Sequence, residues 1–267
     1  MTESQRPQWW RNPKLSGLAI ALSVLAAAVV LLHQLTRPHG VLGLDEYDDG
    51  VYFGSSLRLL EGRLPYRSFV FPHPPGMTLL LLPFAAIGRL AGTRLAFGWV
   101  RIFTAVVALG SVWLVGRILR HRGPLAVLAG ATSFAVFPLS VTATKSSMLE
   151  PYFVLFLLVA IALLFDSGRL VSGRRLFWGA ASLGFAAVLK ILLAPMLLGL
   201  LLVIVIRHRR DRARWRQAVG GYVVGSVVPC LPFFLAGPGS FVRQVVFRQL
   251  QRGVSSGATS LGNRFVF

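Results

Sequence analysis

The sequence predicts an all-α integral membrane protein with about seven transmembrane helices and a large first outer loop. Its mean hydropathy is +0.66, and 55% of its 267 residues are hydrophobic. Only 14% are charged, whereas soluble domains carry roughly a quarter. Apolar runs such as Leu15–Leu35 and Leu125–Ala143 each approach the roughly 20 residues that cross the core of a bilayer. We therefore expect a multi-pass protein of the cell membrane (plasma or inner).

Clusters of basic residues between the apolar runs predict how the chain threads the bilayer. There are four of them: Arg6, Arg11 and Lys14; Arg117, Arg120 and Arg122; Arg169, Arg174 and Arg175; and the run from Arg207 to Arg216. Cytoplasmic loops are enriched in Lys and Arg, so these clusters are assigned to the cytoplasm together with the N-terminus, residues 1–15. The net charge of +19 is explained in the same way, and no nucleic-acid partner is predicted.

The order of elements begins with an outward helix over 16–35, an uncleaved signal anchor, followed by the outer loop 36–94. Further helices are predicted over 95–116, 124–144, 151–166 and 217–236. Residues 176–206 have to cross twice, with a turn near Lys190 and Pro195, because a single helix would place the run Arg207–Arg216 outside. The last segment, 237–267, then lies on the outer side of the membrane.

The outer loop is expected to carry two interfacial helices. Apolar residues recur at helical spacing in its first half, with polar residues between them: Phe53, Leu57, Leu60 and Leu64. Gly62 and Pro65 end this amphipathic helix. The apolar run Met77–Ile87 is only eleven residues long and contains Pro83, so it is predicted to be interfacial or re-entrant rather than to cross.

Five of the nine carboxylates fall in this loop, in a chain that is otherwise basic and apolar: Asp45, Glu46, Asp48, Asp49 and Glu61. Ionisable groups held at a membrane are costly and mark functional sites. A carboxylate just above the bilayer could act as a general base with a raised pKa, and Asp45 and Glu46 are the first candidates. Asp48 and Asp49 are rival bases. The alternative interpretation is a solvated acidic loop that only marks the outer surface.

Five further residues on the outer side are candidates for a phosphate-binding site: His73, Arg101, Lys145, Glu150 and Lys190. His73 stands in the Pro-rich turn Phe71–Gly76, which would fix its position. Outward cations suit a phosphate or pyrophosphate group at the bilayer surface. The alternatives are a hydrogen-bonded loop His and cations that only reach lipid headgroups. No second His or Cys stands at metal-ligand spacing in the sequence, so no zinc site is predicted.

These residues resemble the first half of a GT-C class membrane glycosyltransferase, of the protein O-mannosyltransferase and aminoarabinose transferase superfamily. That class opens its first outer loop with an acidic pair, matched by Asp45-Glu46, and continues with a turn matched by His73-Pro74-Pro75. The stretch Pro65-Tyr66-Arg67 resembles one that precedes this turn in many bacterial members, so Tyr66 and Arg67 are secondary candidates. The match runs over residues 15–250 and is completed by Arg101 opening the next helix, Lys145 five residues before Glu150, and Lys190 in a turn.

The resemblance implies a polyprenyl-phosphate-sugar-dependent glycosyltransferase that acts on the outer face with inversion of configuration. Asp45 would deprotonate an acceptor hydroxyl, while Glu46 and Glu150 would orient the acceptor or the cations. The charge on the leaving phosphate would be stabilised by Lys190, Arg101 and His73. An acidic pair can hold Mg²⁺ or Mn²⁺, but the resemblance favours a mechanism without a metal or other cofactor.

Members of that class are longer than this chain. We therefore expect residues 16–236 to be the transmembrane module of the N-terminal part of such an enzyme, and 237–267 a truncated outer segment. The implied partners are the lipid-linked sugar donor, membrane lipid and an acceptor that the sequence does not identify. Two other functions stay open: a transporter or flippase for a lipid-linked or anionic solute, and a non-catalytic membrane subunit. A transporter would favour inverted repeats and charged or broken helices at mid-membrane, which the sequence does not indicate.

Overall fold

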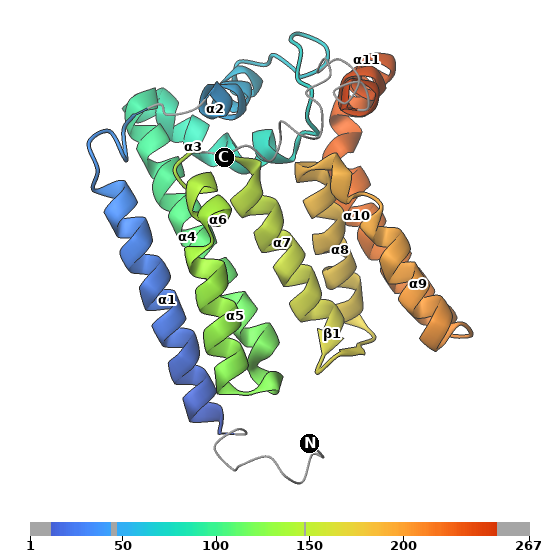
Figure 1. The fold of residues 1–267 in the computed structure, drawn as a ribbon. Helices are drawn as coiled ribbons and strands as arrows, with labels where there is room; N and C mark the ends of the chain where they lie inside the picture. Colours follow the sequence, from blue (N-terminus) through green and yellow to red (C-terminus); the bar gives the residue numbers. More distant parts are fainter. Residues whose placement is uncertain (1–11, 44–46, 147, 250–267) are drawn as a thin grey trace, which may run out of the picture.

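The structure, a computed structural model, describes residues 12–43, 47–146 and 148–249. Most of these residues are helical (Figure 1), which confirms the prediction of an all-α membrane protein. Within these ranges, four helices are long and apolar enough to span a membrane: Pro13–Leu35, Thr93–Arg122, Ile191–His208 and Arg212–Ala236. Shorter apolar helices cover Gly76–Ala91, Pro124–Val136 and Leu149–Leu164. The number of seven crossings stays a prediction.

Seven helices form the body of the described structure and run between two ends (Figure 1): α1 (Pro13–Leu35), α4 (Thr93–Leu119), α5 (Pro124–Val136), α7 (Leu149–Leu164), α8 (Arg174–Leu189), α9 (Met196–His208) and α10 (Arg212–Ala236). At one end, called the loop end, lie α2 (Tyr47–Leu60), α3 (Gly76–Ala91) and α11 (Pro238–Val242). The opposite end, called the basic end, holds the 3₁₀ turn η3 (Arg120–Arg122), the antiparallel strands β1 (Phe165–Asp166) and β2 (Arg169–Leu170), and the α9–α10 connection.

Close packing of small residues holds the helices together, as is usual in membranes. On α10, Gly221 and Gly225 have the spacing of a GxxxG motif, and both meet the backbone of α8. A Cβ atom at Gly225 would lie only 1.9 Å from the carbonyl oxygen of Ala181, so this approach requires glycine. α1 meets α5 through a polar contact, a 2.9 Å hydrogen bond between the hydroxyls of Ser23 and Thr132.

The structure breaks one helix that the sequence analysis expected to be continuous. Residues 124–144 form α5 and a separate short helix, α6 (Pro138–Ala143). Pro138 has no donor N–H and disfavours helical backbone in the residue before it, so Phe137 adopts an extended conformation at φ −61° and ψ 122°. The break expected within 176–206 is present, because α8 and α9 are separate helices. α2 and α3 also lie in the two stretches expected to form interfacial helices.

We expect Gly225→Val to destabilise the protein, because the new side chain would collide with the α8 backbone. Overpacked sites of this kind cost about 1–3 kcal/mol or more. The measurement is the melting temperature of the full chain in detergent. The matched control is Gly199→Val on α9, where a Cβ atom meets nothing within 4 Å. Equal melting temperatures for the two variants would show that the α8–α10 approach does not limit stability.

Candidate functional site

The loop end collects predicted site residues from five separate segments of the chain (Figure 1). His73 lies in the loop between α2 and α3, and Arg101 lies in the third turn of α4. Lys145 follows α6, Glu150 is in the first turn of α7, and Lys190 caps the C-terminus of α8. Tertiary structure therefore brings cations that are far apart in the sequence to one end of the helix bundle.

The acidic stretch is only partly described. Asp45 and Glu46, the predicted catalytic pair, lie outside the described residues. Asp48 and Asp49 fall in the first turn of α2, and Asp48 is half-buried. Within the described ranges, no group of three or more His, Cys, Asp or Glu side chains stands together as metal ligands would. The groups that the structure places at the loop end are chiefly cations, aromatic rings and hydroxyls.

Arg101 is the most deeply buried cation of the site, with only 1% of its surface exposed. Its Nη2 donates a 2.8 Å hydrogen bond to the carbonyl oxygen of Gly43, and its guanidinium lies 5.1 Å from the ring centre of Phe97. A buried guanidinium needs such partners because desolvation of a charge is expensive. Gly43 stands two residues before Asp45, so Arg101 fixes the segment that leads into the acidic pair.

A cavity of about 330 Å³ beside Arg101 is lined by three cationic side chains, those of Arg37, Arg101 and Lys145. Its other walls include Gln34 and Thr144, which are joined by a 3.0 Å hydrogen bond from the Thr144 hydroxyl to Gln34 Oε1. Among the described residues, no carboxylate forms an ion pair with Arg37 or Lys145. Three cations in the wall of one cavity are suited to binding a phosphate group.

Arg37 was not a candidate in the sequence analysis, although the sequence contained a signal for it. It follows the first predicted helix at its outer end, where the positive-inside rule makes Arg uncommon. The structure places it in the cavity wall, with Nη2 3.1 Å from His33 Nε2 on the last turn of α1. The signal for Arg37 in the sequence was therefore its departure from the positive-inside rule.

A second, apolar cavity of about 170 Å³ lies next to the cationic one. It is enclosed by α4, α5, α6 and α7, and its lining is mostly carbon, from residues that include Ala108, Phe134, Leu139, Pro151 and Val154. Thr144 lines both cavities, and Glu150 stands in the wall of the apolar one. A cationic chamber and an apolar chamber that share one wall are suited to an amphipathic molecule with an anionic head.

Lys190 and Glu150 form an ion pair that joins α8 to α7, with 2.8 Å between Nζ and Oε1. The Lys190 ammonium also lies 4.9 Å from the ring centre of Phe153. Both side chains are partly exposed, at 33% and 42%, and ion pairs of this kind contribute only about 0–1 kcal/mol to stability. Glu150 thus pairs with Lys190 in the structure and not with Lys145, the nearer cation in the sequence.

Two tyrosine hydroxyls and one close backbone approach fix the loop that carries His73. The Tyr66 hydroxyl donates a 2.6 Å hydrogen bond to the His73 carbonyl oxygen, and the Tyr52 hydroxyl lies 3.4 Å from His73 Nε2. At the end of the loop, a Cβ atom at Gly76 would lie 2.6 Å from the carbonyl oxygen of Val188. This glycine lets the His73 loop meet the end of α8, directly before Lys190.

Tyr66 is a buried residue of this loop. Its backbone has φ 69°, a left-handed value that is unusual for a bulky residue and costs of order 1–3 kcal/mol. Packing maintains it: the ring centres of Phe241 and Phe233 lie 4.8 Å and 6.3 Å away. Burial raises the pKa of the Tyr66 phenol far above its usual value, and nearby Cys230 adds to the shift. The phenol therefore keeps its proton and can donate to the loop, while Arg67 beside it is exposed.

The segment after α10 is bonded to the same loop. Gln244, in the π-helical turn η5 (Arg243–Phe247), accepts a 2.8 Å hydrogen bond from the Phe71 amide and donates one of 3.3 Å to the Tyr66 carbonyl oxygen. Gln249 donates a 2.6 Å bond to the Pro72 carbonyl oxygen. The sequence analysis missed these two glutamines, since nothing in the sequence pairs them with a loop more than 170 residues away.

We expect Gln244→Leu to loosen the His73 loop, because it leaves the Phe71 amide and the Tyr66 carbonyl without their partner. Each buried group left unsatisfied costs about 1–3 kcal/mol. The measurement is hydrogen exchange of the full chain, in which the Phe71 amide should lose protection. The control is Arg243→Leu, an exposed residue one position earlier. Unchanged protection at Phe71 in the Gln244 variant would contradict the assignment.

A family model described as Glycosyltransferase family 87 matches residues 71–266. The matched region contains His73, Arg101, Lys145 and Lys190. Arg37, Arg67 and the acidic stretch lie before it. No curated protein and no solved structure matches the chain.

Proposed function

Since this chain belongs to glycosyltransferase family 87, we propose that it transfers a sugar from a polyprenyl-phosphate donor to an acceptor hydroxyl with inversion of configuration. Family membership implies glycosyltransferase activity in a membrane protein. The proposal adds the donor, the stereochemistry and the GT-C mode of action. It also assigns the reaction to the loop end, on the outer face of the cell membrane.

The paired cavities are the observation that supports this donor. The chamber lined by Arg37, Arg101 and Lys145 suits the phosphate, and the apolar chamber behind Thr144 suits the first isoprene units of its tail. A soluble sugar nucleotide would use the first chamber but would have no need of the second. A lipid-linked donor would use both chambers, with its phosphate in the cationic chamber and its tail in the apolar chamber.

The proposed reaction is a single displacement at the anomeric carbon. The acceptor oxygen forms a bond to this carbon while the bond from the carbon to the donor phosphate oxygen breaks, and the leaving oxygen keeps the electron pair. The acceptor proton passes to the carboxylate of Asp45. Negative charge therefore grows on the phosphate, where Arg101 and Lys145 oppose it; such electrostatic stabilisation is often the largest catalytic contribution. Arg101 serves twice, because it also holds Gly43, two residues from the base.

Lys190, Glu150 and His73 are proposed to form the side of the site that faces the sugar and the acceptor. Glu150 stands in the wall of the apolar cavity and holds Lys190 at 2.8 Å, so the pair can present one donor and one acceptor group near the phosphate. His73 belongs to a loop fixed against α8 at Gly76. Its ring can hydrogen-bond an acceptor hydroxyl or a phosphate oxygen.

We expect Asp45→Asn to abolish transfer, because the amide cannot take the acceptor proton; loss of a general base lowers a rate about 10²–10⁴-fold. The measurement is sugar transfer from a radiolabelled polyprenyl-phosphate sugar by membranes that contain the full chain. Glu61→Gln is the control, since Glu61 is an exposed carboxylate of the same loop. Full turnover by the Asp45 variant, at normal membrane levels, would rule out this residue as the base.

We expect Lys145→Gln and Arg37→Gln each to weaken donor binding about 10- to 100-fold, because a hydrogen bond to a charged group contributes about 1.5–3 kcal/mol. The measurement is the KM for the lipid-linked donor. Arg94→Gln is the matched control, because Arg94 is an exposed cation in the first turn of α4 and does not line the cavity. If all three variants raised KM equally, general surface charge and not the cavity would bind the donor.

A further inference from the structure

A second charged cavity lies at the basic end, away from the candidate site. It has a volume of about 280 Å³ and is formed where the end of α4 and η3 face the end of α7, the β1–β2 hairpin and the start of α8. Its charged lining consists of four arginines and one carboxylate: Arg117, Arg120, Arg122, Arg175 and Asp166. Four positive charges against one negative leave a formal net charge of +3.

Three of the four arginines of this cavity have partners other than carboxylates. Arg117 stacks on Trp113, with 5.2 Å from the guanidinium carbon to the ring centre, and Arg175 donates a 3.2 Å bond to the carbonyl oxygen of Ala162. Arg122 donates at 3.0 Å to Nε2 of His121, whose other ring nitrogen bonds the Ile118 carbonyl oxygen. Each arginine keeps further N–H groups that these contacts do not use.

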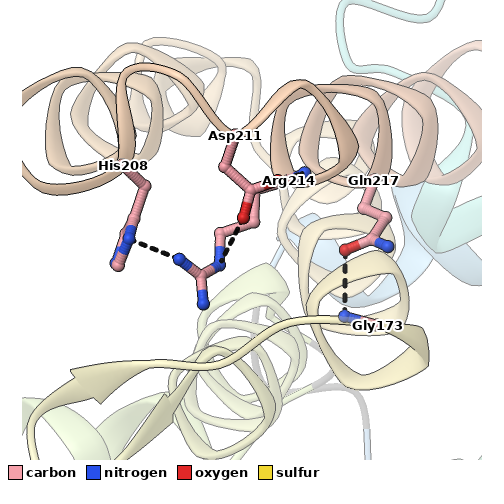
Figure 2. A network of polar contacts seen from close by, with 5 residues as sticks. All are labelled: Gly173, His208, Asp211, Arg214 and Gln217. Atoms are coloured by element: carbon pink, nitrogen blue, oxygen red, sulfur yellow. Dashed lines mark hydrogen bonds and ion pairs between the residues drawn. The ribbon is translucent and has the colours of Figure 1, made fainter.

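Among the described residues, none of these arginines forms an ion pair. The neighbouring arginine at the α9–α10 connection is different (Figure 2). There Arg214 pairs with Asp211 at 3.5 Å and donates to His208, while Gln217 accepts a 2.9 Å bond from the Gly173 amide. Arg214 thus has a carboxylate partner, and the Gln217 bond ties α10 to the start of α8. The arginines of the cavity beside η3 have no ion-pair partner among the described residues, although Asp166 lies in the same wall.

The cavity stands at the depth of lipid headgroups. Trp113 on α4 and Trp178 on α8 are exposed. Each lies about one helical turn from an arginine, on the side toward the middle of its helix. Exposed Trp residues mark the boundary between acyl chains and headgroups. Two such residues, on different helices, place the arginines of η3 and α8 just beyond this boundary, among the phosphates.

We propose that this cavity is a binding site for the phosphate of an anionic phospholipid. Basic pockets between transmembrane helices bind acidic headgroups, and planar guanidinium groups recognise phosphate oxygens through paired hydrogen bonds. The acyl chains would leave the cavity over the apolar surface beside Trp113. The site is separate from the proposed transfer reaction, which uses the opposite end of the helices.

The test is lipid retention by the full chain, purified in detergent and analysed by native mass spectrometry with phosphatidylglycerol or phosphatidylcholine. We expect at least tenfold stronger retention of phosphatidylglycerol. The double variant Arg120→Gln with Arg122→Gln should lose this preference about tenfold or more, since each basic residue adds to the attraction of an anionic lipid. The control removes the same charge outside the cavity, with Arg209→Gln and Arg210→Gln, and should change retention less than twofold.

Three results would overturn the proposal. Equal losses in the two double variants would mean that diffuse charge attracts the lipid. Absence of any preference for phosphatidylglycerol in the wild type would contradict the site directly. Displacement of the lipid by inorganic phosphate at millimolar concentration would assign the cavity to a soluble phosphate. Should the double variant fail to fold, as judged by its melting temperature in phosphatidylcholine, Arg120→Glu alone provides the same comparison, because the Arg120 side chain forms no hydrogen bond or ion pair with any described residue.

Discussion

The buried guanidinium of Arg101 is the interaction on which the loop end depends. A charge with 1% exposure is tolerable only when its donors are used, and the carbonyl oxygen of Gly43 is one of the acceptors that satisfies it. The same bond holds Gly43, which follows α1, against α4. Arg101 also stands in the wall of the cationic cavity, so one side chain joins the segment after α1 to the proposed phosphate site.

The other contacts at the loop end join segments that are far apart in the sequence. Tyr66 and Gln244 hold the loop that carries His73, and their segments lie more than 170 residues apart. Gly76 then seats that loop on the end of α8. Because these contacts are hydrogen bonds and ring packing in a buried setting, they restrict the loop before any ligand arrives. Pre-organisation of this kind is what electrostatic stabilisation of a leaving phosphate requires.

The two ends of the helices carry positive charge in different ways. At the loop end, cations converge on a chamber that adjoins an apolar one. At the basic end, arginines surround an open cavity beside exposed Trp residues, while Arg214 is neutralised inside the protein (Figure 2). A donor lipid and a structural lipid would therefore meet the protein at opposite ends, each through its phosphate.

The class of protein could be predicted from the sequence, and most of the candidate residues were proposed from it. Apolar runs of membrane length require helices, because backbone groups must bond internally in lipid, and the Lys190–Pro195 turn was visible as a break in such a run. The sequence did not determine which charges meet: Glu150 pairs with Lys190, Arg37 joins Arg101 and Lys145, and Gln244 reaches the His73 loop. Helix periodicity is a local property, whereas these contacts depend on the order in which helices pack. That order is visible only in the tertiary structure, through close approaches such as that of Gly225 on α10 to the backbone of α8.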